Sequence, residues 1–135
     1  MKKLGLIIIL IVISCALISC RAKPVKVSDV TEFEKLFSGA IKYDIRDDAS
    51  CEEGHIKGFV CMGSTEKDTL IKNIDLVSLD DNQIVILIGE EEQVLYIFER
   101  LSKLGHKNMY YFDGGYQWYV AAKGEGFIPE TGCGC

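Results

Sequence analysis

The sequence predicts an α/β domain in which a parallel sheet is covered by helices on both faces. Short runs of apolar, often β-branched residues alternate along the chain with amphipathic stretches at helical spacing. The run at 84–88, IVILI, is apolar at every position, which is typical of a strand buried on both faces. Because strands and helices alternate, we expect right-handed crossovers and a functional site at the carboxyl ends of the strands.

The expected elements follow in chain order. The stretch 21–27 ends in a first strand, and the stretch 28–39 reads as a helix that Ser28 caps and Gly39 closes. Strands at 40–45 and 59–62 flank a polar loop with room for one helical turn. The remaining elements are a helix near 66–73, a strand at 84–88, a helix from the glutamates at 90–92 to Gly105, a strand at 108–112 and a last helix after Gly114 and Gly115.

Residues 1–19 have the pattern of a signal peptide, with a positive start followed by an uncharged apolar run. The run ends in the letters LISC, which resembles the lipobox of bacterial lipoproteins. That resemblance implies cleavage before Cys20, whose thiol would carry lipid, including palmitate. Cys15 is a weaker second position, and an uncleaved anchor is the alternative reading. Either reading places the protein on the cell membrane or outer membrane with its domain outside the cytoplasm.

This interpretation divides the chain into four segments. They are a signal peptide at 1–19, a lipid-anchored tether at 20–26, a folded domain at 27–129 and a cysteine-containing tail at 130–135. The net charge is −5, and cleavage removes Lys2 and Lys3 and so brings it to −7. An acidic chain without a basic run is a poor partner for nucleic acid. The expected partners are the membrane and, as an open possibility, another envelope protein; no cofactor is expected.

Four cysteines remain in the predicted mature domain: Cys51, Cys61, Cys133 and Cys135. An exported protein can form disulfides, and four thiols allow three pairings that the sequence does not distinguish. Cys61 lies inside an expected strand and reads as a small buried apolar residue. Cys133 and Cys135 lie on an expected flexible end, where they form either a labile pair suited to thiol exchange or a staple to Cys51 or Cys61. Two sulfur ligands are too few for a metal ion, so no metal site is predicted.

Three short motifs occur in order along the chain: DIR at 44–46, GHIKG at 54–58 and DGGYQW at 113–118. Together they resemble the rhodanese-like family over about residues 25–129, and this resemblance implies a five-stranded parallel sheet with flanking helices. The residues that carry the motifs, all read as scaffold, are Asp44, Arg46, Gly54, His55, Gly58, Gly114, Gly115 and Trp118.

Physical reasoning gives these scaffold residues specific roles. Asp44 and Arg46 lie two apart on one strand face, and Arg46 is expected to pair with Glu52 or Glu53. His55 is expected to fix its loop by a hydrogen bond, and Trp118 to cover one side of the core.

The resemblance also identifies the site at which rhodaneses carry a nucleophilic cysteine, in a C-x-x-G-x-R turn after the central strand. Counting back from Gly105 places Ile88 at the cysteine, Glu91 at the glycine and Gln93 at the arginine. The active-site-like loop is Ile88, Gly89, Glu90, Glu91, Glu92 and Gln93. Carboxylates at an exposed helix start are each favoured by about 0.3–1 kcal/mol, so the loop supplies its own negative charge and repels anionic sulfur donors.

We therefore expect a membrane-anchored rhodanese-like domain that lacks thiosulfate sulfurtransferase activity at the usual site and acts as a binding or accessory module. The alternative is a thiol–disulfide redox or sulfur-carrier protein. In that case Cys133 and Cys135 perform the chemistry, with Cys51 as an exchange partner.

Overall fold

The computed structural model describes residues 21–134. The predicted signal peptide at 1–19, the lipidation site Cys20 and the last tail residue Cys135 lie outside the described residues. Among the residues described, no helix combines the length and the apolar character needed to cross a membrane.

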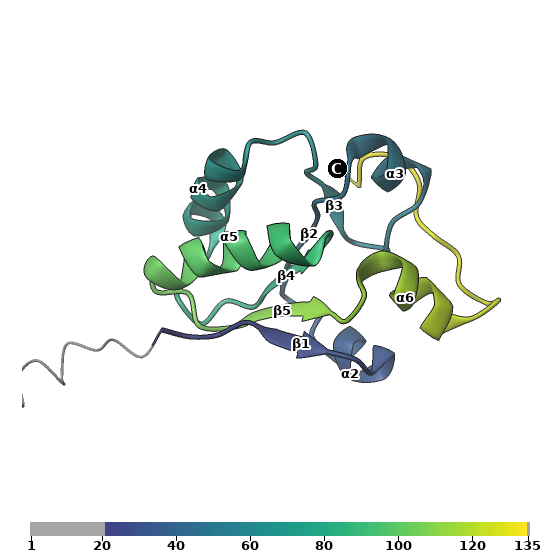
Figure 1. Cartoon of the computed structure of the whole chain (residues 1–135), viewed down its shortest axis with the longest axis horizontal. Coiled ribbons are helices and arrows are strands. Elements are labelled where there is room, and N and C mark those ends of the chain that lie inside the picture. The colour runs from purple at the N-terminus through teal and green to yellow at the C-terminus, as the bar shows by residue number, and fades with distance from the viewer. Residues whose placement is uncertain (1–20, 135) are drawn as a thin grey trace, which may run out of the picture.

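Five parallel strands form one sheet in the order β1-β5-β4-β2-β3, which confirms the expected five-stranded parallel sheet (Figure 1). The strands are β1 (Val25–Val27), β2 (Ile41–Asp44), β3 (Val60–Cys61), β4 (Val85–Ile88) and β5 (Met109–Phe112). From β2 the chain continues to β3 on one side, and from β4 it continues to β5 on the other, so the direction of progression reverses between β4 and β2. In such sheets the crevice at the reversal is the usual position of a site.

Helices cover both faces of the sheet. They are α2 (Val30–Lys35), α3 (Asp48–Glu53), α4 (Lys67–Val77), α5 (Glu91–Lys103) and α6 (Gly115–Lys123). The adjacent helices α4 and α5 pack on one face, whereas α2 and α6 pack on the other (Figure 1).

Three local expectations need correction. Asp29, not Ser28, caps α2 by accepting from Glu32 N at 2.8 Å; α2 ends at Lys35 with Leu36 as its C-cap, before Gly39; and α4 extends beyond residue 73 to Val77. The helical turn expected in the polar loop after β2 is present as α3.

Strand β4 is the centre of the core, as its unbroken apolar sequence predicts. Its four side chains are all buried, and successive residues point to opposite faces of the sheet. Val85 and Leu87 join the cluster beneath α4 and α5, while Ile86 and Ile88 join the cluster beneath α2 and α6. Each such side chain contributes about 1.5–3 kcal/mol by burial, so β4 anchors both layers and fixes the loop that follows it.

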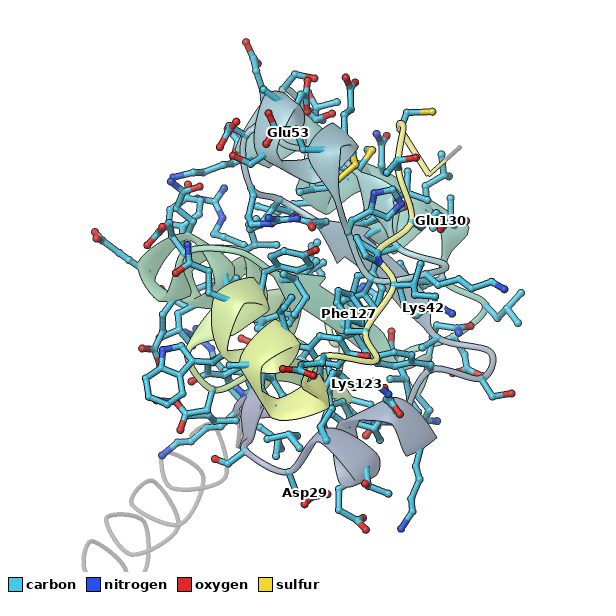
Figure 2. All side chains as sticks on the ribbon, turned by 90° about the vertical axis from the view of Figure 1, so that its right-hand side faces the viewer. Asp29, Lys42, Glu53, Lys123, Phe127 and Glu130 are labelled. Atoms are coloured by element: carbon cyan, nitrogen blue, oxygen red, sulfur yellow. A yellow bond between two sulfur atoms is a disulfide. The ribbon has the colours of Figure 1, made fainter. Side chains whose placement is uncertain are left out.

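The segment after α6 returns to the edge of the sheet at β3. Glu130 forms an antiparallel bridge with His55, and Gly132 N donates to Glu52 O at 2.9 Å. Cys61 N donates to Cys133 O, also at 2.9 Å. These backbone hydrogen bonds hold the segment along α3 and β3, so the part of the tail that the structure describes is docked rather than a flexible end (Figure 2).

Candidate functional site

A pocket of about 610 Å³ opens at the carboxyl ends of the central strands. It is formed by the loop and first turn after β4, the loop after β2 and the start of α6. The lining residues are Ile45, Arg46, Asp47, Ser50, Leu87, Ile88, Gly89, Glu90, Glu91, Gln93, Val94, Tyr111, Phe112, Gly114, Gly115, Tyr116, Gln117 and Trp118. Most of the predicted active-site-like loop therefore lines one cavity.

Ile88 closes the base of this pocket. Its side chain is 1% exposed and packs in the core cluster beneath α2 and α6. Gly89 follows at a point where an added Cβ would overlap the side chain of Ile45, which explains why glycine stands there. None of the lining residues carries a thiol, so the pocket holds no sulfur nucleophile among the residues that the structure describes.

The three glutamates stand at the start of α5, as expected. Glu90 is the N-cap residue without a side-chain capping hydrogen bond, and Glu91 and Glu92 occupy the first turn. Glu91 Oε1 lies 2.7 Å from Lys26 Nζ and accepts from the Tyr111 hydroxyl at 3.1 Å.

These contacts change the ionisation of both partners. The hydrogen bond from Lys26, followed by that from Tyr111, lowers the pKa of Glu91 below its usual value. The same hydrogen bond to Glu91 raises the pKa of Lys26. The sequence did not reveal this ion pair, because β1 and α5 are far apart along the chain. Lys26 comes close to Glu91 only after β1 has paired with β5.

Arg46 is the one cation among the lining residues, and it is already bound. Its guanidinium donates to the Asp44 carboxylate at 2.6 Å and to Gly54 O at 2.8 Å. It also stacks on the Tyr116 ring, 3.7 Å from the ring centroid. The expected pairing with Glu52 or Glu53 is wrong. β2 ends at Asp44, and the chain turns directly after it, so that both the backbone N–H and the guanidinium of Arg46 reach the Asp44 carboxylate, which is 1% exposed. Arg46 therefore acts as scaffold and ties two loops together.

The charge around the pocket opposes anions. Asp47, Glu90 and Glu91 line it, against Arg46 as the single lining cation. Asp47 also caps α3 by accepting from Ser50 N at 2.9 Å, and its hydrogen bonds with Ser50, first from the hydroxyl, lower the pKa of Asp47. An anion entering the pocket would meet Asp47 at the start of α3 and Glu90 and Glu91 at the start of α5, where these carboxylates already occupy the positive helix ends.

Gly114 and Gly115 have φ of +78° and +71°, which confirms the turn expected before the last helix. Trp118 lies one turn further along α6, and the Cβ of any other residue at 114 would overlap its side chain. Trp118 is 69% exposed at the pocket rim. The expectation that it covers the core is wrong, because Tyr119 is the α6 residue that points into the core and Trp118 lies on the outer side.

His55 lies in a second, closed region and fixes its loop, as expected. The ring is 0% exposed, and Nδ1 lies 2.9 Å from Cys51 O. Gly58 has φ of +83° and donates its N–H to Glu130 at 3.0 Å. This hydrogen bond, ahead of the effect of His55, lowers the pKa of Glu130. The GHIKG motif therefore connects α3, β3 and the C-terminal segment.

Cys51 and Cys61 form a disulfide between α3 and β3. This pairing corrects two expectations: Cys61 is not a free apolar residue, and the tail is not stapled to either cysteine. Cys133 belongs to a different disulfide, and its carbonyl oxygen accepts a hydrogen bond from Cys61 N. Neither Cys51 nor Cys133 is among the described residues that line the pocket. Sequence could not make this choice, because all three pairings are open until the register of β3 is known.

Comparisons with known proteins agree with this architecture. The family model described as rhodanese-like domain matches residues 29–122. A crystal structure of the Alr3790 protein from Anabaena sp. is 21% identical with a TM-score of 0.59, covering 77% of this chain and 82% of that one. A solution structure of the rhodanese-like domain of the same protein is 22% identical with a TM-score of 0.56, covering 77% of each chain. No curated protein matches the sequence.

Proposed function

The chain belongs to the rhodanese-like domain family, and on that premise we propose that it is a membrane-anchored binding or accessory module that does not transfer sulfur from thiosulfate at the usual pocket. The observation that carries this proposal is Ile88, which fills the expected cysteine position at the base of the pocket. Sulfur transfer of the family type needs a thiolate at that point, held by helix N–H groups and positive charge.

The surroundings of Ile88 support the same conclusion. Glu90 and Glu91 stand where an anionic donor would approach, and Arg46 is engaged by Asp44 and Gly54. A pocket of this charge favours neutral or cationic groups over anions. The exposed ring of Trp118 at the rim offers a surface on which a partner's cationic or apolar side chain can stack.

We place the domain outside the cytoplasm on a lipid attached to Cys20. The support is the sequence of residues 1–20 together with the Cys51–Cys61 disulfide, which suits an oxidising compartment. Intact-mass measurement of the membrane-extracted protein would show the lipid as added mass. A Cys20→Ser variant is expected to lose that mass and to leave the membrane fraction, whereas retention of the lipid would assign it to another residue.

Thiocyanate formation from thiosulfate and cyanide tests the proposed lack of activity. The full chain is expected to produce no more thiocyanate than the same chain with Ser at 51, 61, 133 and 135. The variant Ile88→Cys/Glu91→Gly/Gln93→Arg restores the family turn and serves as the positive control. Turnover by the wild type above the serine control would contradict the proposal.

Thiol–disulfide exchange by Cys133 and Cys135 is the second candidate function. It is supported by the position of the tail, whose Cys133 O accepts from Cys61 N at 2.9 Å beside the Cys51–Cys61 disulfide. An incoming dithiol would reduce a tail disulfide, and the tail thiolates would then exchange with Cys61. Reduction potentials of the Cys133→Ser/Cys135→Ser variant and of the wild type would separate the two disulfides. A tail disulfide with a reduction potential as low as that of the Cys51–Cys61 bridge would leave only a structural role.

A further inference from the structure

We propose that reduction of the Cys51–Cys61 disulfide creates a binding site for a borderline metal ion such as Zn²⁺, with Cys51 Sγ, Cys61 Sγ and His55 Nδ1 as ligands. These three donor groups lie within 4.8 Å of one another at the junction of α3 and β3. Two thiolates and an imidazole, with water in a fourth position, form an established ligand set for zinc. This site lies apart from the pocket after β4 and does not depend on the proposed function of that pocket.

The distances suit a tetrahedral ion. Zinc binds sulfur at about 2.3 Å and imidazole nitrogen at about 2.0–2.1 Å, which separates the two donor atoms by roughly 3.6 Å in a tetrahedron. His55 Nδ1 lies 3.7 Å from Cys61 Sγ. His55 Nδ1 and Cys61 Sγ are therefore already at the required spacing. The two sulfur atoms must move apart once their bond is broken, and Nδ1 must exchange its hydrogen bond to Cys51 O for the metal.

The second nitrogen of His55 gives an independent reason. In the disulfide form, Nδ1 faces the Cys51 carbonyl oxygen, which only accepts, so Nδ1 carries the proton. Nε2 is buried and makes no hydrogen bond, although Glu130 Oε2 lies 3.4 Å away. A buried polar atom left in this state is costly, and such atoms in native proteins call for a functional or structural explanation.

Metal binding resolves this unsatisfied nitrogen. When Nδ1 holds the metal, the ring proton resides on Nε2, which lies 3.4 Å from Glu130 Oε2. The N–H can then donate to that carboxylate and form the carboxylate–histidine–metal arrangement that orients many ligating histidines. Figure 2 shows the disulfide beside the C-terminal segment that carries Glu130. The docked segment thus supplies the residue that the metal-bound form requires.

The chemistry balances in two steps. A dithiol reductant transfers two electrons and two protons to the disulfide, becoming a disulfide itself and leaving Cys51 and Cys61 as thiols. A divalent ion then replaces the two thiol protons, which are released to solvent, while the His55 proton moves from Nδ1 to Nε2. In the reverse direction a small disulfide oxidant accepts two electrons from the two thiolates and, with two protons, becomes two thiols; the Cys51–Cys61 bond forms again and the ion is released to solvent. The region therefore exchanges a covalent link for a metal link at the same place.

Cobalt titration of the full chain in detergent tests this proposal, because Co²⁺ replaces Zn²⁺ and gives a thiolate charge-transfer band. The protein is reduced with a phosphine under anaerobic conditions and freed of reductant before titration. We expect one equivalent of Co²⁺ in a band that Zn²⁺ displaces, and no band in the oxidised protein. Cys51→Ser/Cys61→Ser should abolish the band, and Cys133→Ser/Cys135→Ser should retain it.

Two further measurements keep the test decisive if a variant folds poorly. Glu130→Gln leaves all three ligands in place and should weaken Co²⁺ binding by about 10- to 100-fold. Zn²⁺ should raise the melting temperature of the reduced wild type but not of Cys51→Ser/Cys61→Ser. A reduced wild type that binds no more Co²⁺ than the Cys51→Ser/Cys61→Ser variant, or whose band disappears only with the tail cysteines, would overturn the proposal.

Discussion

The pocket after β4 and the disulfide region at β3 both lie where strands of the one sheet end, but they differ in their reactive groups. The pocket is open, the described residues that line it include no sulfur nucleophile, and it carries carboxylates, with Ile88 among its buried lining residues. The β3 region is closed and contains the Cys51–Cys61 disulfide and the fully buried His55. A rhodanese-like framework therefore does not by itself place a cysteine in the crevice after β4; the side chains at each site decide its chemistry.

Removal of the disulfide should have the largest effect and would show how far the β3 region depends on it. Cys51→Ala/Cys61→Ala opens a link between residues ten apart, and short closed loops of this kind contribute about 2–3 kcal/mol to the free energy of unfolding. Urea denaturation measures the loss, with the pocket variant Glu90→Gln as the control expected to change little. An unchanged midpoint would mean that the tail and β3 hydrogen bonds alone hold this edge.

Gly114→Ala should have the next largest effect and tests the pocket rim. The left-handed conformation at φ +78° costs a non-glycine residue about 1–2 kcal/mol, and the added Cβ would also displace Trp118. Gly39→Ala is the control for the added Cβ, because Gly39 also has a positive φ, +71°, but nothing lies within 4 Å of an added Cβ. Thermal melts of the two variants should differ; equal losses would indicate that Trp118 moves freely at the rim.

Ile88→Cys should have a smaller effect on stability, about 1–2 kcal/mol, because it removes part of one buried side chain. Its thiol should react slowly with an alkylating agent, since buried thiols hold a high pKa. Adding Glu91→Gly and Gln93→Arg changes two charges at the helix start and should speed alkylation by about tenfold. Equal rates for the single and triple variants would show that burial, not charge, controls this position.

Acid titration of Glu91 should give the smallest effect. Its pKa in the folded protein is lowered from 4.5 by Lys26 and Tyr111. The ion pair therefore contributes stability above the unfolded pKa, and this contribution is lost as the pH falls through the folded pKa. Both side chains of the pair are partly exposed, so the effect should shrink at high salt. Glu91→Gln should remove this acid dependence, whereas Glu92→Gln should leave it unchanged. If only Glu92→Gln removed it, Glu92 rather than Glu91 would be the partner of Lys26.

The fold was readable from sequence because its signals are local. The apolar run at 84–88 corresponds to β4, whose side chains are all buried. The helical spacing of Val94, Ile97, Phe98, Leu101 and Leu104 corresponds to the inner face of α5, and all of these side chains are buried except Leu104 at the C-cap, which is 50% exposed. Position 88 could also be aligned, because Gly105 closes α5 and sets the count back to the strand.

The features that sequence reasoning missed depend on segments that meet only in space. Lys26 reaches Glu91 from β1, and the C-terminal segment reaches His55 through Glu130. Arg46 had several acidic neighbours in sequence, and geometry selected Asp44. The cysteine pairing was open for the same reason: periodicity places Cys61 in a strand but does not say which loop that strand faces.

Thiosulfate titration of the isotope-labelled full chain in detergent, followed through the backbone amide signals of residues 88–93, tests the central claim most directly. We expect no saturable shift in the wild type, and a saturable shift when Glu90, Glu91 and Glu92 are all replaced by Gln. Saturable binding of thiosulfate to the wild-type amides would contradict it, because the carboxylates at the start of α5 would then not exclude an anionic sulfur donor.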